Sequence, residues 1–166
     1  MFVVDWVKNL PHELATFLLA IIPLTEVRAS IPVAMGLFKM SAWSAFFWSI
    51  LGSVFITFVL VYSLDLATKF LRPRFRWADK FFSWLFERTR KKFEGKYLTY
   101  GEIALVIFVA IPLPLTGVWT GAAAAYLFGV EKKKAFWLVS LGTIIAGIIV
   151  TLVSIGGLAV FGLNAD

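Results

Sequence analysis

Two residues able to carry chemistry, Glu26 and Arg28, lie in an otherwise apolar part of the chain. They belong to the run PLTEVR at residues 23–28, within the apolar stretch 14–38. If this stretch lies in a membrane, both are candidates for function, because ionisable side chains are costly to bury there. A carboxylate could couple ligand entry to proton movement, and a guanidinium could hold an anion. Residues two apart do not face each other on a helix, so pairing requires a partly unwound 25–28, another helix or a second copy.

A second run, PLTGVW at residues 114–119, repeats the first motif 91 residues later without its charges. Each proline opens the backbone, and each threonine is expected to cap the N-terminus of the short helix that follows. Two such helix N-termini facing each other at mid-depth would form an anion-binding arrangement. The expected binding residues for substrate or protons are Thr25, Glu26, Arg28, Thr116, Gly117, Trp119 and Thr120. The expected breaks of the two hairpins are Pro23, Pro32, Pro112, Pro114 and Gly121.

The similarity continues beyond these motifs. With one residue dropped, Leu37-Phe38 aligns with Leu127-Phe128, and Gly52-Ser53 aligns with Gly142-Thr143. Each half has an apolar run, a Pro-Leu-Thr break, a second short apolar run, a polar link and a long apolar stretch. We therefore predict a duplication within one membrane domain, 1–166. Repeat 1 covers about 12–67, a basic segment covers 69–97, and repeat 2 covers about 101–162.

The composition indicates an all-α integral membrane protein. Hydrophobic residues make up 60% of the chain, whereas about 45–50% is usual in soluble domains. Residues 40–64 and the stretch after Lys134 carry no charge and are long enough to span a bilayer. The net charge of +6 is better explained by anionic lipid headgroups than by nucleic acid, since the basic residues border apolar segments. The chain has no cysteine, and we expect no metal, no cofactor and no enzyme activity, because no nucleophile–base pair or known catalytic motif is present.

The basic residues also predict the topology. The broken stretches could each span as a kinked helix, or each could be a re-entrant hairpin. In the second case 69–97 and 131–134 share one face, which then holds 13 of the 16 Lys and Arg residues, ten plus three. The positive-inside rule favours that arrangement. The fold expected is an inverted repeat of two re-entrant helical hairpins, each followed by a transmembrane helix. The basic regions would be cytoplasmic and both termini outside, in what we expect to be a prokaryotic cell membrane.

Between the repeats, the basic segment has helical periodicity. Trp77, Phe81, Trp84 and Leu85 recur at the spacing of one helix face. This predicts an amphipathic interfacial helix, with its aromatic side in lipid and its basic side on headgroups. A polar loop with a few aromatic anchors is the alternative.

The motifs EVRASIP, 26–32, and PLPLTGVWTG, 112–121, resemble those of the small multidrug export protein family, which is similar to the DedA/VTT membrane proteins. The resemblance covers about residues 12–160. It implies paired re-entrant loops, inverted repeats, and movement of lipids such as polyprenyl phosphates, with proton coupling. It also implies that embedded acidic and basic residues are required, and here Glu26 and Arg28 could take those roles. The matching motif of the second half has neither.

Three functions follow from these observations. The leading hypothesis is a DedA-like transporter or flippase for an amphiphilic, anionic substrate such as a lipid phosphate, with possible proton coupling. The first alternative is a proton-coupled exporter of cationic drugs, and the second is a non-transporting membrane scaffold. The expected partners are the bilayer and a lipid-like or drug-like small molecule. A homodimer is one way to bury the two breaks.

Overall fold

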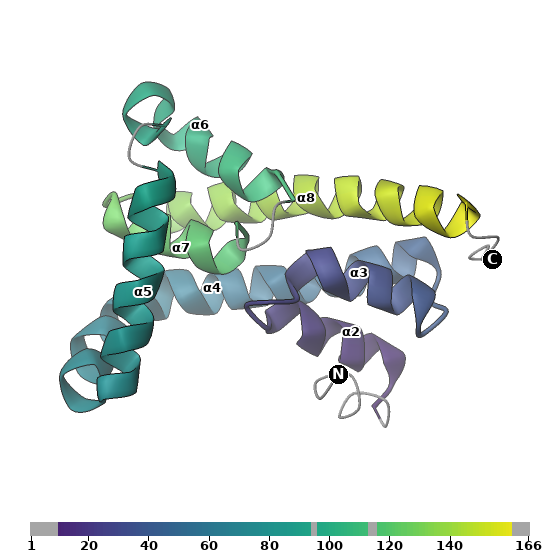
Figure 1. Cartoon of the computed structure of the whole chain (residues 1–166), viewed down its shortest axis with the longest axis horizontal. Coiled ribbons are helices and arrows are strands. Elements are labelled where there is room, and N and C mark those ends of the chain that lie inside the picture. Colours follow the sequence, from purple (N-terminus) through teal and green to yellow (C-terminus); the bar gives the residue numbers. More distant parts are fainter. Residues whose placement is uncertain (1–9, 94–95, 113–115, 161–166) are drawn as a thin grey trace. The chain divides into compact units, whose positions relative to one another are not determined.

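The computed structural model describes residues 10–93, 96–112 and 116–160, and all regular structure in these ranges is helical. The sequence expectation of an all-α protein is confirmed for this part of the chain (Figure 1). The helices are α2 (His12–Ile21), α3 (Glu26–Gly36), α4 (Ala42–Arg74), α5 (Arg76–Phe93), α6 (Lys96–Ala110), α7 (Val118–Leu127) and α8 (Lys132–Val160).

Two of these helices are long and apolar enough to cross a membrane. The qualifying parts are Ala42–Leu64 of α4, with 23 residues, and Lys132–Gly157 of α8, with 26 residues. At a rise of about 1.5 Å per residue they reach roughly 35–39 Å, more than the ~30 Å hydrocarbon core of a bilayer. The helices around the two breaks are shorter, with 10 to 15 residues. None of these four could cross that core alone.

The chain packs as two units, and the boundary passes through both long helices. Unit 1 contains Met1–Phe55 and Thr143–Asp166, and unit 2 contains Ile56–Gly142. Unit 1 therefore has α2, α3, the first part of α4 and the last part of α8. Unit 2 has α5, α6, α7 and the remaining parts of α4 and α8. Each unit thus combines one pair of short helices with a portion of each long helix.

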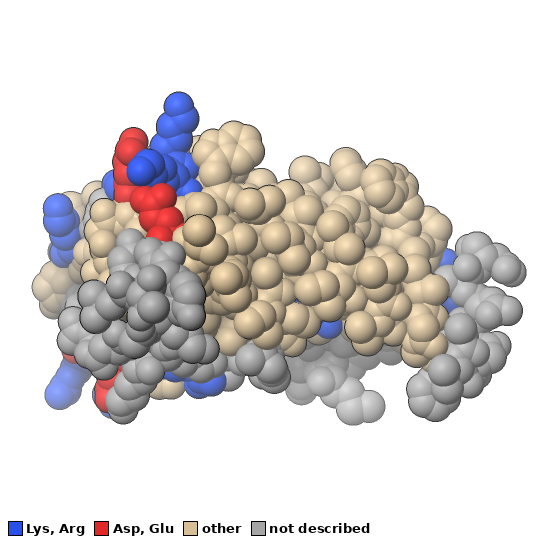
Figure 2. Space-filling model, turned by 90° about the horizontal axis from the view of Figure 1, so that it is seen from above, with Lys and Arg blue, Asp and Glu red and all other residues tan. Residues whose placement is uncertain are grey.

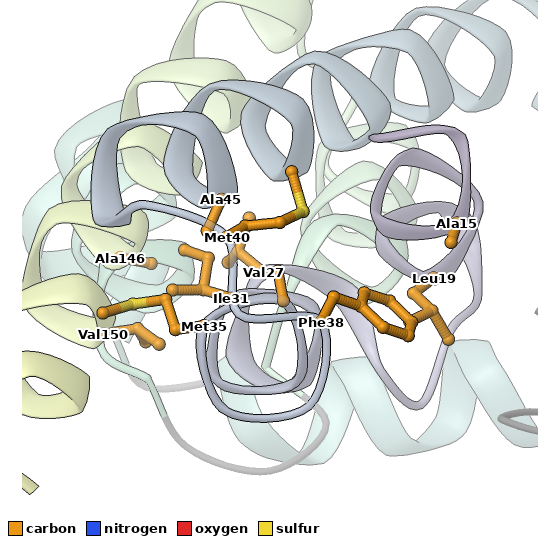
Figure 3. Packing of buried hydrophobic residues seen from close by; sticks show 11 residues of the cluster. Ala15, Leu19, Val27, Ile31, Met35, Phe38, Met40, Ala45, Ala146 and Val150 are labelled. Carbon is orange, nitrogen blue, oxygen red and sulfur yellow. The ribbon is translucent and has the colours of Figure 1, made fainter. Parts of the chain in front are cut away.

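In unit 1, α2 and α3 pack side by side as a helical hairpin. The first part of α4 and the last part of α8 complete its apolar core (Figure 3). Ile31 and Met35 of α3 lie in this core with Ala45 of α4 and Ala146 of α8. Close approach needs glycine here, because a Cβ at Gly52 would collide with the backbone of α2.

In unit 2, α7 packs against both α6 and α5. A Cβ added to Gly142 of α8 would lie 2.8 Å from the carbonyl oxygen of Val106 in α6. Gly121 lies within α7, and a Cβ added to it would lie 2.6 Å from a methyl of Val109 in α6. Gly121 therefore provides space between α7 and α6 and does not break the hairpin.

The basic segment is organised differently from the prediction. Its first residues continue α4 through Pro73 to Arg74, and only Arg76–Phe93 forms the amphipathic helix α5. The aromatic side of α5 is partly used within the protein, because Phe81 packs on Trp119 of α7 at a ring separation of 6.3 Å. Trp77 and Trp84 remain exposed, while the side chain of Leu85 lies outside the described residues. The aromatic face of α5, which was expected to lie in lipid, therefore packs partly on α7 and is partly exposed at the protein surface.

Candidate functional site

The first hairpin turns where Pro23 prevents α2 from continuing. Ile22 has an extended backbone, with ψ 134°, as expected for a residue that precedes proline. The backbone N–H groups of Thr25 and Glu26 both donate to the Ile22 carbonyl, each at 3.2 Å, and α3 begins at Glu26. The break predicted at Pro23 is present. Pro32 is not a break, because it lies exposed within α3, where it costs one bond of the helix ladder.

Glu26 and Arg28 form an ion pair at this turn. An Nη of Arg28 donates to a carboxylate oxygen of Glu26 at 2.8 Å. The pairing of residues two apart is explained by the backbone, because Glu26 has φ +40°, which is uncommon for a residue other than glycine. The first residue of α3 therefore departs from helical geometry. This departure allows two residues that are only two positions apart to form an ion pair.

This ion pair is largely buried within the protein. The side chain of Glu26 is 5% exposed and that of Arg28 is 15% exposed. Its neighbour Val27 belongs to the apolar core of unit 1. A charge with this degree of burial is tolerated only when it is paired, because it has lost most of its solvation by water. Glu26 is further favoured by its place in the first turn of α3, where the helix dipole is positive.

Thr25 takes a different role from the one predicted. It occupies the N-cap position of α3 but makes no side-chain cap bond to it. Its hydroxyl donates instead to the carbonyl oxygens of Leu19 and, at 3.4 Å, Ile22. The reason is that the last carbonyls of α2 have no helical N–H partners once proline ends the helix. Thr25 thus completes the helix before the turn.

The second turn repeats this arrangement without charges. Thr116 donates its hydroxyl to the carbonyl of Ile111 at 3.0 Å, and Gly117, not Thr116, occupies the N-cap position of α7. The Thr120 hydroxyl donates to the Gly117 carbonyl at 3.1 Å. Trp119 is half-buried and packs edge-on against α5. The break expected at Pro112 follows the end of α6, whereas Pro114 lies outside the described residues.

The structure brings the predicted site residues together in two groups. Thr25, Glu26 and Arg28 share the turn in unit 1. Thr116, Gly117, Trp119 and Thr120 share the turn in unit 2. A single site made from both turns stays a prediction.

Sequence reasoning missed a polar contact close to the ion pair. Ser30 of α3 and Ser49 of α4 are both fully buried, and their hydroxyls lie 2.8 Å apart. Ser30 follows Glu26 by four residues, so the two share one face of α3, a spacing that could have identified it. In the described ranges, no group of three or more His, Cys, Asp or Glu residues could hold a metal ion. The polar side-chain groups described at and near this turn are a carboxylate, a guanidinium and hydroxyls.

Comparison with known proteins identifies the family of this chain. Residues 26–149 match the model of a family described as "Putative small multi-drug export protein". The match begins at Glu26, so it includes the ion pair and the second turn but not Pro23 or Thr25 of the first turn. No curated protein and no solved structure matches the chain, so the suggested relation to DedA/VTT proteins stays a prediction. Because the family model covers more than half of its length, the chain belongs to the small multi-drug export protein family.

Proposed function

We propose that this protein is a membrane transporter of amphiphilic, drug-like organic ions and that its substrate engages the Glu26–Arg28 pair. Membership of the family and the two long apolar helices support a function in membrane transport. The observation that carries the assignment to this turn is the buried ion pair itself, at 2.8 Å. A charged pair that is costly to bury marks a candidate pathway for ions or protons.

A charged ligand can use this pair by exchange. An organic cation would take the place of the Arg28 guanidinium on the carboxylate, and a proton on Glu26 would release it again. Once Arg28 has been displaced, Glu26 holds either the cation or a proton, so the exchange of one monovalent cation for one proton leaves the net charge at this turn unchanged. The displaced guanidinium must meet solvent or another acceptor, because an unpaired buried charge is costly. This cycle would suit a drug-like organic cation, and the family description names multi-drug export.

A second candidate substrate is an anionic amphiphile such as a lipid phosphate. One observation favours it, since the Arg28 side chain is three times as exposed as that of Glu26, 15% against 5%. Arg28 is therefore the more accessible member of the pair. A bidentate guanidinium is also well suited to phosphate.

For the membrane topology we propose two re-entrant hairpins in an inverted repeat. The short helices support it, because α2 and α3 return on one another and reach only about 15–17 Å each. Equivalent contacts in the two units also support it. The Ser30–Ser49 contact between α3 and α4 matches the approach of Gly121 in α7 to Val139 in α8, at sequence offsets of 91 and 90. With this topology the basic segments lie on the cytoplasmic side of a cell membrane.

Flux through proteoliposomes tests this proposal. Purified protein would be assayed for uptake of a fluorescent organic cation driven by a pH gradient, and for transfer of a fluorescent lipid phosphate between leaflets. If the substrate is a cation, Glu26→Gln should lower flux at least about tenfold, because losing one partner of a buried charge contact costs about 2–5 kcal/mol. If it is an anion, Arg28→Gln should have that effect.

The matched controls come from the exposed ion pair of the same chain. Lys134 and Glu102 lie 3.3 Å apart with side chains 59% and 45% exposed, so Lys134→Gln and Glu102→Gln should transport like the wild type. Wild-type flux no faster than that of protein-free vesicles for both substrates would overturn the transport proposal and leave the scaffold as the better explanation.

A further inference from the structure

A cavity in unit 2 is separate from the residues of the ion pair. It has a volume of about 300 Å³, at the lower end of the range for ligand pockets. Val61 and Leu64 of α4 line one wall, and Ala125 of α7 and Ala135 of α8 line others. All of its lining residues belong to Ile56–Gly142. The small alanine side chains leave this space unfilled between three helices.

The cavity has an apolar interior and a charged rim. Its rim includes Glu131 and Lys132, both exposed, at the start of α8. Lys133 and Lys134 follow in the same helical turn. Three lysines at a helix N-terminus are poorly placed, since that end already carries partial positive charge. Lys134 is paired with Glu102 and Glu131 is acidic, but three lysines against these two glutamates still leave a net charge of +1 (three minus two), which favours an anion at the rim.

Other charged residues of unit 2 occur in the same region. Lys134 of α8 contacts Glu102 of α6. In Figure 2 the blue and red side chains gather together on the face shown. A region where apolar surface meets basic residues is typical of the level of lipid headgroups. The apolar interior and the basic rim therefore have the two chemistries of an anionic phospholipid.

We propose that this cavity binds one anionic phospholipid, with part of an acyl chain between α4, α7 and α8 and the phosphate at the lysines that begin α8. The hydroxyl of Tyr126, which lines the cavity and lies 3.3 Å from the Thr68 hydroxyl, offers a further hydrogen bond to the glycerol region. The site is formed without Glu26 or Arg28, so it does not depend on the proposed transport cycle.

Native mass spectrometry of the full chain, released from detergent after titration with phosphatidylglycerol, tests this proposal. The wild type should retain one lipid in preference to diacylglycerol with the same acyl chains. Ala125→Leu and Ala135→Leu fill the cavity from different walls, and each should weaken retention at least about tenfold. The double variant Lys132→Gln/Lys133→Gln should weaken phosphatidylglycerol binding about tenfold and leave diacylglycerol binding unchanged.

Two matched controls come from unit 1. Ala42→Leu narrows an apolar groove of about 230 Å³ whose lining includes no charged residue, and Lys39→Gln removes an exposed lysine from a different link. Neither should change lipid retention. Equal retention of phosphatidylglycerol and diacylglycerol by the wild type would overturn the proposal. So would retention by a folded leucine variant at the wild-type level, or an equal loss in Ala42→Leu.

Discussion

Removal of Arg28 should destabilise this protein far more than removal of an exposed lysine. Arg28→Met keeps most of the side-chain volume and leaves the Glu26 carboxylate without its guanidinium at 5% exposure. Breaking a buried pair in this way costs about 3–5 kcal/mol. The position of Glu26 in the first turn of α3 recovers at most about 1 kcal/mol. The loss should therefore be roughly 2–4 kcal/mol, whereas Lys134→Met in the exposed pair should lose about 0–1 kcal/mol.

The assay is reversible unfolding in mixed micelles with increasing sodium dodecyl sulfate, followed by circular dichroism. A double-mutant cycle with Glu26→Gln isolates the contribution of the pair. The double variant should be more stable than Arg28→Met alone, because no charge is then left buried. Equal losses of unfolding free energy in Arg28→Met and Lys134→Met would show that burial of the Glu26–Arg28 pair does not determine its contribution. So would the absence of any recovery when Glu26→Gln is added to Arg28→Met.

Two further predictions concern packing and the turn. Gly142→Ala should destabilise the protein by about 1–3 kcal/mol, because its Cβ would lie 2.8 Å from the carbonyl of Val106. The control is Gly156→Ala, whose Cβ would meet nothing within 4 Å; this variant should be neutral or more stable by up to about 1 kcal/mol. Thermal unfolding of the two variants and the wild type compares these stabilities. Thr25→Val removes the hydroxyl that bonds the Leu19 carbonyl and should cost about 0.5–1.5 kcal/mol, whereas Thr25→Ser should retain most of the stability; equal losses would contradict the capping role.

The large features of the fold could be predicted because they depend on local patterns. Uninterrupted apolar runs gave the two long helices, and Pro23 and Pro112 marked the ends of α2 and α6. A proline inside a short helix was harder to interpret. Pro32 looks like a break in sequence, yet α3 continues through it, because packing of the helix on α2 and α4 offsets one lost backbone bond.

Details of the candidate site depended on information that spacing does not contain. The pairing of Glu26 with Arg28 needs the positive φ of Glu26. No residue type in PLTEVR predicts that backbone conformation. Threonine after Pro-Leu can cap the helix on either side. The unsatisfied carbonyls of the preceding helix decided the outcome at both turns. The periodicity of α5 identified an amphipathic helix but not the surface that receives its aromatic face, because this surface comes from α7, far along the chain.

Re-entrant hairpins, as proposed above, would place the ion pair within the membrane and both basic regions on one side. Because the chain has no native cysteine, single cysteines can be placed at Lys96, Lys133 and Lys39 and labelled with a membrane-impermeant maleimide in oriented vesicles. If the hairpins are re-entrant, Lys96→Cys and Lys133→Cys should be labelled from the same, cytoplasmic side and Lys39→Cys from the opposite side. Labelling of Lys96→Cys and Lys133→Cys from opposite sides would contradict this topology.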